Sequence, residues 1–221
     1  YYENKKFNVI NNYKPVIFSD DEIIILFRTM DEYKNQCINK KYYKLYYSYS
    51  ILFRLLYACG LRVSEVAKIT TDNINFSENT INIIDSKRHI SRLVVFSNSM
   101  KICLENYIKL FNIENGLLFK NSRNKMISCA SIRKYYKKIL ELCNLNNNSH
   151  IHDLRHCFCN KALNQMLEKG YDENVIIVYL YKYIGHKYIA ETEYYLHFTD
   201  YNKKKLIETN DTFSKSLYEG V

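Results

Sequence analysis

The stretch His152-Asp153-Leu154-Arg155-His156 begins a helical pattern that we expect to extend over residues 152–168. His152 and Arg155 are three positions apart, so both side chains should project from one face of the first turn. The N-terminal end of a helix also favours an anion, because it carries partial positive charge and free N–H groups. The stretch therefore predicts an anion site. A helix start whose side chains only cap loops is the alternative, since an H-x-x-R pair is common by chance.

Arg62 lies in the segment Gly60-Leu61-Arg62-Val63-Ser64-Glu65, directly after a predicted helix over residues 41–59. A glycine before an arginine at a corner between helices can direct the guanidinium into a cleft. The guanidinium fork suits two non-bridging phosphate oxygens. We expect Glu65, three residues further on, to hold Arg62 in position. The alternative is a surface Arg–Glu pair that contributes little.

Lys87 is expected at the tip of a β-hairpin. Apolar and β-branched residues fill positions 80–84 and 93–96, and the polar stretch 85–92 separates them. An ammonium group on such a tip can reach into a minor groove and donate a proton to a departing oxygen. A solvated turn lysine fits the same pattern.

His186 follows Gly185 at the end of an apolar helical pattern over 173–183, and Tyr195 comes nine residues later. A free tyrosine has a pKa near 10, so ionising it at pH 7 costs about 4 kcal/mol. A nearby base and several cations reduce that cost, and the other motifs supply them. Tyr194 is an adjacent rival that the sequence leaves open, in a chain with 22 tyrosines.

We expect no metal, no cofactor and no disulfide framework. His152 and His156 are four positions apart with His150 nearby, but no acidic third ligand stands at the spacing of an H-E-x-x-H motif. The seven cysteines are an odd number without a C-x-x-C pair, which favours a reducing cytoplasm. Most of them are expected to be small buried hydrophobic residues.

Length and composition limit the possible fold and partners. A chain of 221 residues, 47% of them hydrophobic, can form one sizeable domain, or one domain with a short appendage. The formal net charge of +9 suits a polyanion such as nucleic acid, although a solvated lysine-rich surface gives the same value. The apolar runs are too short to span a membrane. The patterns together predict a mainly α fold with one small antiparallel β-sheet.

In order and spacing, these motifs resemble the catalytic domain of tyrosine recombinases, the phage-integrase and Xer-like family. Family members show an L-R-x-S-E segment, a hairpin lysine, H-x-L-R-H, L-G-H and a tyrosine nine residues past the last histidine. Ile184 in place of leucine is the one departure. The choice of Lys87 as the family's hairpin lysine is supported by residues 92–94, Arg-Leu-Val, which resemble the R-x-V strand start five residues beyond that lysine. The matching positions are 61–65, Lys87, 152–156, 184–186 and Tyr195.

The resemblance implies a site-specific DNA recombinase that cleaves and rejoins DNA through a 3′-phosphotyrosine. The bond energy would be kept in that linkage, so neither ATP nor metal is required. A 5′-hydroxyl from a second strand would reverse the step. The implied roles are nucleophile for Tyr195, neutralisation of phosphate charge for Arg62 and Arg155, proton acceptor for His152, proton donor for Lys87 and phosphate hydrogen bonding for His186.

The resemblance also implies an organisation: residues 1–17 as a linker from a missing N-terminal core-binding domain, 18–200 as the catalytic domain and 201–221 as a C-terminal tail. Such tails dock on a neighbouring protomer in the family, so we expect a tetramer on double-stranded DNA and no membrane. The alternative is a tail helix folded back on its own domain.

The long spacing between His152 and His186 resembles the integrases of some transposons, which favours a mobile element. The abundance of Lys, Asn, Ile and Tyr suggests an AT-rich bacterial genome, so the expected location is a bacterial cytoplasm. Two other functions fit the same fold. One is a type IB topoisomerase-like nicking and closing enzyme, and the other is a non-catalytic DNA-binding regulator.

Overall fold

The computed structural model describes residues 15–85, 90–186, 188–193 and 195. One layer of helices contains α1 (Asp20–Asn35), α2 (Lys40–Cys59) and α5 (Cys129–Leu142). The segment Ser19-Asp20-Asp21-Glu22, an N-cap followed by an acidic first turn, predicts a helix start, and the first of these helices begins there. The Ser19 hydroxyl accepts the N–H of Glu22, and the Glu22 carboxylate accepts the N–H of Ser19. This reciprocal cap satisfies two N–H groups that the helix leaves free.

The predicted hairpin is present and belongs to a three-stranded antiparallel sheet. Strands β1 (Ile74–Asn75), β2 (Thr80–Asp85) and β3 (Ile90–Val95) lie in that order, and Thr80 pairs with Val95. The short β1 was not predicted from the sequence, because two residues are too few to show alternation. Lys87, between β2 and β3, lies outside the described residues.

The sequence predicts helices over residues 98–112, 128–143, 152–168 and 173–183, and all four are present with small changes at their ends. The sequence also predicts a short helix over residues 63–69, and the helix at the corner after α2 is shorter than that. A 3₁₀ turn, η1 (Thr71–Asn73), precedes the sheet. The helices are α3 (Val63–Val66), α4 (Asn98–Leu110), α6 (Asp153–Glu168), α7 (Glu173–Ile184) and α8 (Ala190–Glu193). The fold is therefore mainly α with one small antiparallel sheet, as expected.

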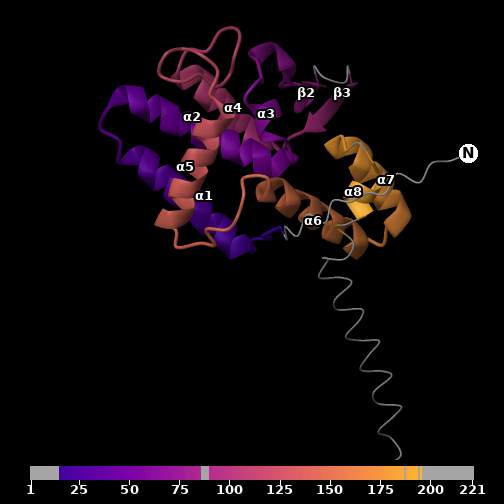
Figure 1. The fold of residues 1–221 in the computed structure, drawn as a ribbon. Coiled ribbons are helices and arrows are strands. Elements are labelled where there is room, and N and C mark those ends of the chain that lie inside the picture. The colour runs from indigo at the N-terminus through magenta and orange to yellow at the C-terminus, as the bar shows by residue number, and fades with distance from the viewer. Residues whose placement is uncertain (1–14, 86–89, 187, 194, 196–221) are drawn as a thin grey trace, which may run out of the picture.

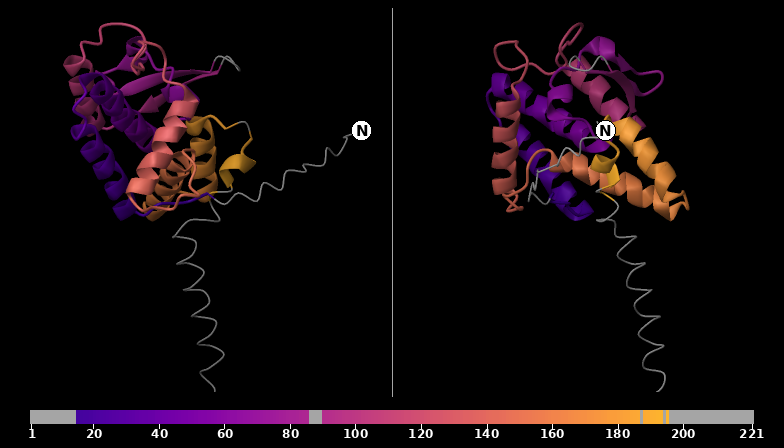
Figure 2. Two further views of the ribbon diagram at one scale, coloured as in Figure 1. Left: turned by 60° about the vertical axis from the view of Figure 1, so that its left-hand side comes forward. Right: turned by 45° about the vertical axis from the view of Figure 1, so that its right-hand side comes forward.

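Two hydrophobic cores lie under these elements. The larger core joins α1, α2, α4 and α5 to the sheet, with Leu52 and Leu55 of α2 at its centre. The smaller one lies between α6 and α7, which are drawn side by side in orange beneath the sheet (Figure 1). Helix α6 also packs on α2, and α7 contacts β3 (Figure 2). The two cores therefore meet along α6 and α7.

The expectation that most cysteines are buried is wrong. Only Cys59, Cys157 and Cys159 are buried, and the other four are half-buried. Three of those four lie at or just beyond helix ends, where neighbouring elements cover one side of the residue. All seven are free thiols.

No helix in the described part of the chain is both long and apolar enough to cross a membrane.

Candidate active site

The corner between α2 and α3 directs Arg62 toward the end of α7. Gly60 ends α2 with a φ of 62°, a left-handed conformation that favours glycine. Arg62 is the N-cap of α3, and its backbone N–H donates to Glu65 at 2.7 Å. Its Nη1 donates to the same carboxylate at 2.9 Å, and its Nη2 donates to the carbonyl of Gly185 at 2.5 Å. Arg62 therefore links α3 to the residue that precedes His186.

Glu65 binds a second guanidinium that sequence reasoning had not placed in the site. Arg92 of β3 donates from Nη1 and Nη2 to the two carboxylate oxygens, both at 2.8 Å, and from Nε to the carbonyl of Tyr183 at 2.8 Å. Burial would raise the pKa of Glu65, but the hydrogen bonds and charges of Arg92 and Arg62 lower it to about 2. The Glu65 side chain is 9% exposed. The interpretation as a weak surface pair therefore does not apply.

Arg155 is buried behind this network. Its Nη1 donates to the carbonyl of Gly60 at 2.7 Å and its Nη2 to that of Ile184 at 2.6 Å. The buried Nε has no hydrogen-bond partner among the residues that the structure describes. Burial lowers the pKa of this guanidinium to about 10, so it remains charged at neutral pH. Arg155 thus ties the corner after α2 to the end of α7 and keeps a positive charge between them.

His186 and His152 lie at helix ends around these cations. Gly185 ends α7 with a φ of 65°, and the Nδ1 of His186 then lies 2.9 Å from the hydroxyl of Thr192. His152 is the N-cap of α6. Burial, followed by the charges of Arg155 and Arg62, lowers the pKa of His186 to about 3. Burial by its neighbours, followed by His156 and Arg155, lowers the pKa of His152 to about 4, although His152 is an exposed residue at the surface. Both imidazoles are therefore neutral at pH 7.

Tyr195 lies in the smaller core and is only 3% exposed. Its hydroxyl lies 2.8 Å from the Nδ1 of His156, and it also hydrogen-bonds the thiol of Cys159. The Tyr195 ring stacks on that of His186, with centroids 6.2 Å apart. Burial is the main cause that raises the pKa of Tyr195, with Cys159 adding to it. The candidate nucleophile is thus neutral and enclosed in this structure.

The described site residues that the sequence singled out lie close together. Hydrogen bonds connect Arg62 and Glu65 to the end of α7, and Arg155 binds the same end. His152 contacts His156 edge to face, with ring centroids 4.9 Å apart, and His156 contacts Tyr195. Lys87 and Tyr194 lie outside the described residues.

Sequence reasoning missed Arg92 and His156 as functional side chains. A signal for Arg92 was present: strand alternation places it on the same face as the buried Val94, where a charged group needs a partner. For His156 the signal was weaker, because the sequence alone gave no reason to pair it with Tyr195.

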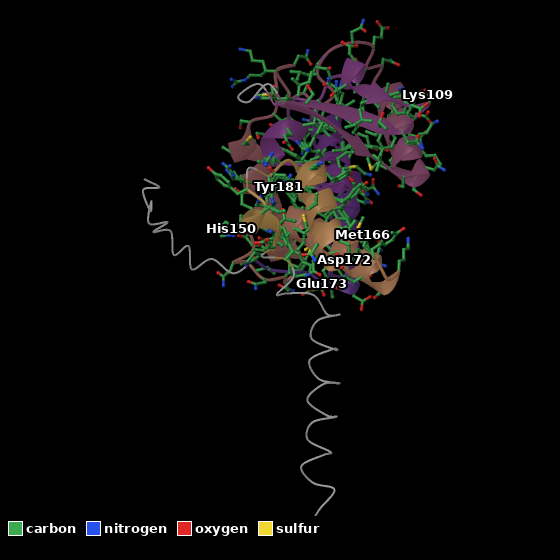
Figure 3. The ribbon with its side chains drawn as sticks, turned by 90° about the vertical axis from the view of Figure 1, so that its right-hand side faces the viewer. Lys109, His150, Met166, Asp172, Glu173 and Tyr181 are labelled. Carbon is green, nitrogen blue, oxygen red and sulfur yellow. The ribbon has the colours of Figure 1, made fainter. Side chains whose placement is uncertain are left out.

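A pocket of about 660 Å³ opens beside the imidazoles. Basic side chains from α5 line one part of it and apolar side chains from α2 and α3 another. Figure 3 labels one of its lining residues, His150, which lies far from Lys109 at the other end of the molecule. Within the described ranges, no group of three or more His, Cys, Asp or Glu residues could hold a metal ion. The pocket is lined by Leu56, Leu61, Val63, Arg133, Tyr136, Lys137, His150, Ile151, His152 and His156.

The fold is that of tyrosine recombinase catalytic domains. The structure resembles XerA recombinase with a TM-score of 0.68 at 20% identity, covering 92% of this chain and 66% of that one. It also resembles the XerH recombinase bound to palindromic difH substrate, with a TM-score of 0.70 at 17% identity, covering 89% and 53%. The catalytic domain of bacteriophage HP1 integrase gives a TM-score of 0.57 at 18% identity, covering 89% and 96%.

The sequence comparison makes the assignment specific. Residues 26–202 match the phage integrase family, and the chain belongs to that family. A tyrosine recombinase of Pseudothermotoga lettingae is 29% identical over 170 residues, which are 77% of this chain and 54% of the relative. The XerC recombinase of Staphylococcus aureus strain MSSA476 is 26% identical over 198 residues, or 88% and 60%. The chain thus spans between half and two thirds of the length of these relatives, and the resemblance inferred from the motifs is confirmed.

Proposed function

We propose that this chain is a site-specific DNA recombinase that cleaves and rejoins double-stranded DNA through a 3′-phosphotyrosine on Tyr195. The observation that carries the proposal is the clustering of the tyrosine with two arginines and three imidazoles, drawn from four separate segments of the chain. A set of cations around one hydroxyl suits attack on a phosphodiester, because charge develops on the phosphate oxygens.

In this mechanism the Tyr195 oxygen attacks the phosphorus, and the bond from phosphorus to the 5′ oxygen breaks. Arg62 and Arg155 neutralise the developing charge, and His186 donates a hydrogen bond to the phosphate. Arg62 and Arg155 donate to backbone carbonyls in the structure, and phosphate oxygens would compete for those donors. Because Tyr195 is 3% exposed, the side chains that cover its hydroxyl must move before a phosphate can reach it.

The supporting roles follow from the same contacts. Glu65 holds Arg62 in position through the backbone and side-chain hydrogen bonds of that residue. Lys87 would protonate the leaving 5′ oxygen. No metal, ATP or other cofactor takes part, since the phosphotyrosine retains the bond energy. Loss of one charge-stabilising donor should cost about 10²–10³ in rate.

The partners are part of the proposal. The names of the similar structures describe XerH on difH DNA and the Tn1549 transposon integrase on transposon end DNA. A net charge of +9 suits the same polyanion. We assign residues 1–17 to a linker, 18–200 to the catalytic domain and 201–221 to a tail that docks on a neighbouring copy in a tetramer. A mobile element in a bacterial cytoplasm remains the proposed setting.

A covalent trapping assay tests the proposal. The protein is incubated with nicked duplexes that carry fragments of its host element, and SDS-resistant protein–DNA adducts are counted. The expected result is an adduct in wild type and in Tyr194→Phe that disappears in Tyr195→Phe. Exchange of strands between two duplexes separates a recombinase from a topoisomerase. DNA binding without any adduct would point instead to a regulator.

A further inference from the structure

We propose that His156 is a catalytic residue of this site, which holds the Tyr195 hydroxyl and receives its proton as the phosphotyrosine bond forms. The inference rests on the proposed function above and deepens it. The resemblance assigns the proton to His152, whereas the contact in the structure involves the next imidazole along the same helix.

The geometry places His156 directly against the reacting atom. Its Nδ1 lies 2.8 Å from the Tyr195 hydroxyl oxygen, within the ordinary range of a hydrogen bond. His156 is four residues after His152 and three before Cys159, so α6 presents all three side chains on one face. The Cys159 thiol contacts the same hydroxyl. One face of α6 therefore encloses the nucleophile from two directions.

The protonation state of His156 suits an acceptor. Burial, and then the charge of Arg155, lowers the pKa of His156 to about 4. The ring is therefore neutral at pH 7 and keeps a lone pair on one nitrogen. When Nε2 carries the proton, Nδ1 accepts from the tyrosine. Several titratable and charged groups face His156. They are His152 and Arg155 on its own helix, His186 at the end of α7, Tyr195, and Arg133, Lys137 and His150 around the adjacent pocket.

The position of His152 suits a different task. It is the N-cap of α6, part of it is exposed, and it lines the pocket beside the site. Its contact with Tyr195 runs through His156, whose ring it meets at an interplanar angle of 87° and a centroid distance of 4.9 Å. His152 can orient His156 and support the charge that His156 gains.

The proposed step balances. The O–H bond of Tyr195 breaks as an N–H bond forms on His156, and the tyrosine oxygen bonds to phosphorus. The bond from phosphorus to the 5′ oxygen breaks, and that oxygen takes a proton from a separate donor, for which Lys87 is the candidate. In the rejoining step an incoming 5′-hydroxyl returns a proton to that donor, and Tyr195 regains its own from His156.

The first test needs no DNA, so it is independent of the proposed function. The ring nitrogens of ¹⁵N-labelled histidines are observed by NMR at pH 7 in wild type and in Tyr195→Phe. We expect the substitution to shift the Nδ1 resonance of His156 and to leave His150 unchanged, because the hydroxyl it removes contacts His156. An unchanged His156 together with a shifted His152 would overturn the proposal.

The second test measures the chemical step. His156→Asn keeps a polar atom near the position of Nδ1 but cannot take a proton. At pH 7 it should slow single-turnover adduct formation by about 10²–10⁴-fold, the usual contribution of a general base. The difference in rate between wild type and His156→Asn should shrink about tenfold for each unit of rising pH, because hydroxide replaces the missing base. His152→Asn is the comparison, and its loss should not depend on pH in this way.

The outcomes separate the two claims. A wild-type rate in His156→Asn, or a loss that is the same at every pH, would refute the role of His156. No adduct from wild type would count against the proposed function, while the NMR comparison would still decide the contact. Far-UV circular dichroism checks folding. If His156→Asn unfolds, His156→Gln replaces it in the rate measurement, and the NMR spectrum of Tyr195→Phe still tests the contact between His156 and Tyr195.

Discussion

At the scale of single residues, Glu65 organises the site. Its carboxylate accepts from Arg62 on one side and from both terminal nitrogens of Arg92 on the other. Its pKa of about 2 lies below the ordinary value of 4.5, so its pairing stabilises the folded protein above pH 4.5. That contribution falls as the pH is lowered from 4.5 toward 2.

Removal of one partner should be costly because the carboxylate is buried. Arg92→Gln leaves Glu65 with Arg62 as its remaining guanidinium, and we expect the free energy of unfolding to fall by about 3 kcal/mol. Arg92→Lys should cost less, since it keeps the charge but not the paired donors. Urea unfolding at pH 7 measures both variants.

Arg28→Gln, on the exposed side of α1, is the matched control and should change the free energy of unfolding by less than about 0.5 kcal/mol. A loss in Arg92→Gln no larger than this control would show that Arg92 does not stabilise the buried carboxylate.

The sequence could predict that the described candidate residues come close together, but not the contacts that each of them makes. Arg62 and His186 were found because helix ends and glycines place them at corners. Arg155 donates to the carbonyl of Gly60, 95 residues away in the sequence, and to that of Ile184, 29 residues away. No local sequence pattern encodes such contacts. The pairing of His156 with Tyr195 is also long-range, across 39 residues.

At the scale of elements, the corner between α2 and α3 determines where Arg62 points. Gly60 has a φ of 62°, and its carbonyl accepts from Arg155. A Cβ at this position would overlap Cδ1 of Phe158 on α6. The corner therefore requires glycine for two reasons, the left-handed backbone and the close approach of α6.

Gly60→Ala and Gly170→Ala separate these two reasons. Gly170 also has a positive φ, 81°, but a Cβ there would meet no atom within 4 Å. Gly170→Ala should therefore cost only the backbone strain, about 1–2 kcal/mol. Gly60→Ala should cost clearly more, because Phe158 must move. Urea unfolding of both variants measures the difference, and equal losses would contradict the tight packing of α6 on this corner.

The elements themselves were largely readable from the sequence, and the deviations have physical causes. The Ser19 cap, the hairpin and the long helices were predicted, since caps and hydrophobic periodicity are local signals. The helix expected over 63–69 ends at Val66, where the chain turns toward η1 and the sheet. That turn depends on tertiary packing, which local propensity does not encode.

At the scale of the whole molecule, the site lies where the two cores meet. Helix α6 packs on α2 of the larger core, and the smaller core between α6 and α7 encloses Tyr195. Three neutral imidazoles lie at this junction together with two guanidinium groups, and two of the imidazoles, His156 and His186, are half-buried. Protonation of these imidazoles would add positive charge beside existing cations, so the folded state should resist it.

Acid should therefore destabilise the protein before the carboxylates titrate. The pKa values of His156 and His186, about 4 and about 3, lie below the ordinary 6.5, so the unfolded chain binds more protons between these limits. The free energy of unfolding should fall as the pH is lowered from 6.5 toward 4. Urea unfolding at pH 7 and pH 5 measures the fall, and His156→Asn and His186→Asn should each reduce it. If the free energy of unfolding falls between pH 7 and pH 5 as much in both variants as in wild type, the two imidazoles are not held neutral by burial.

We expect Tyr195 to become covalently bound to DNA. The most direct measurement digests the trapped protein–DNA adduct with protease and nuclease and identifies the nucleotide-bearing peptide by mass spectrometry. The expected product is a nucleotide linked through a 3′ phosphate to Tyr195. A nucleotide on Tyr194 or on any other residue would contradict it.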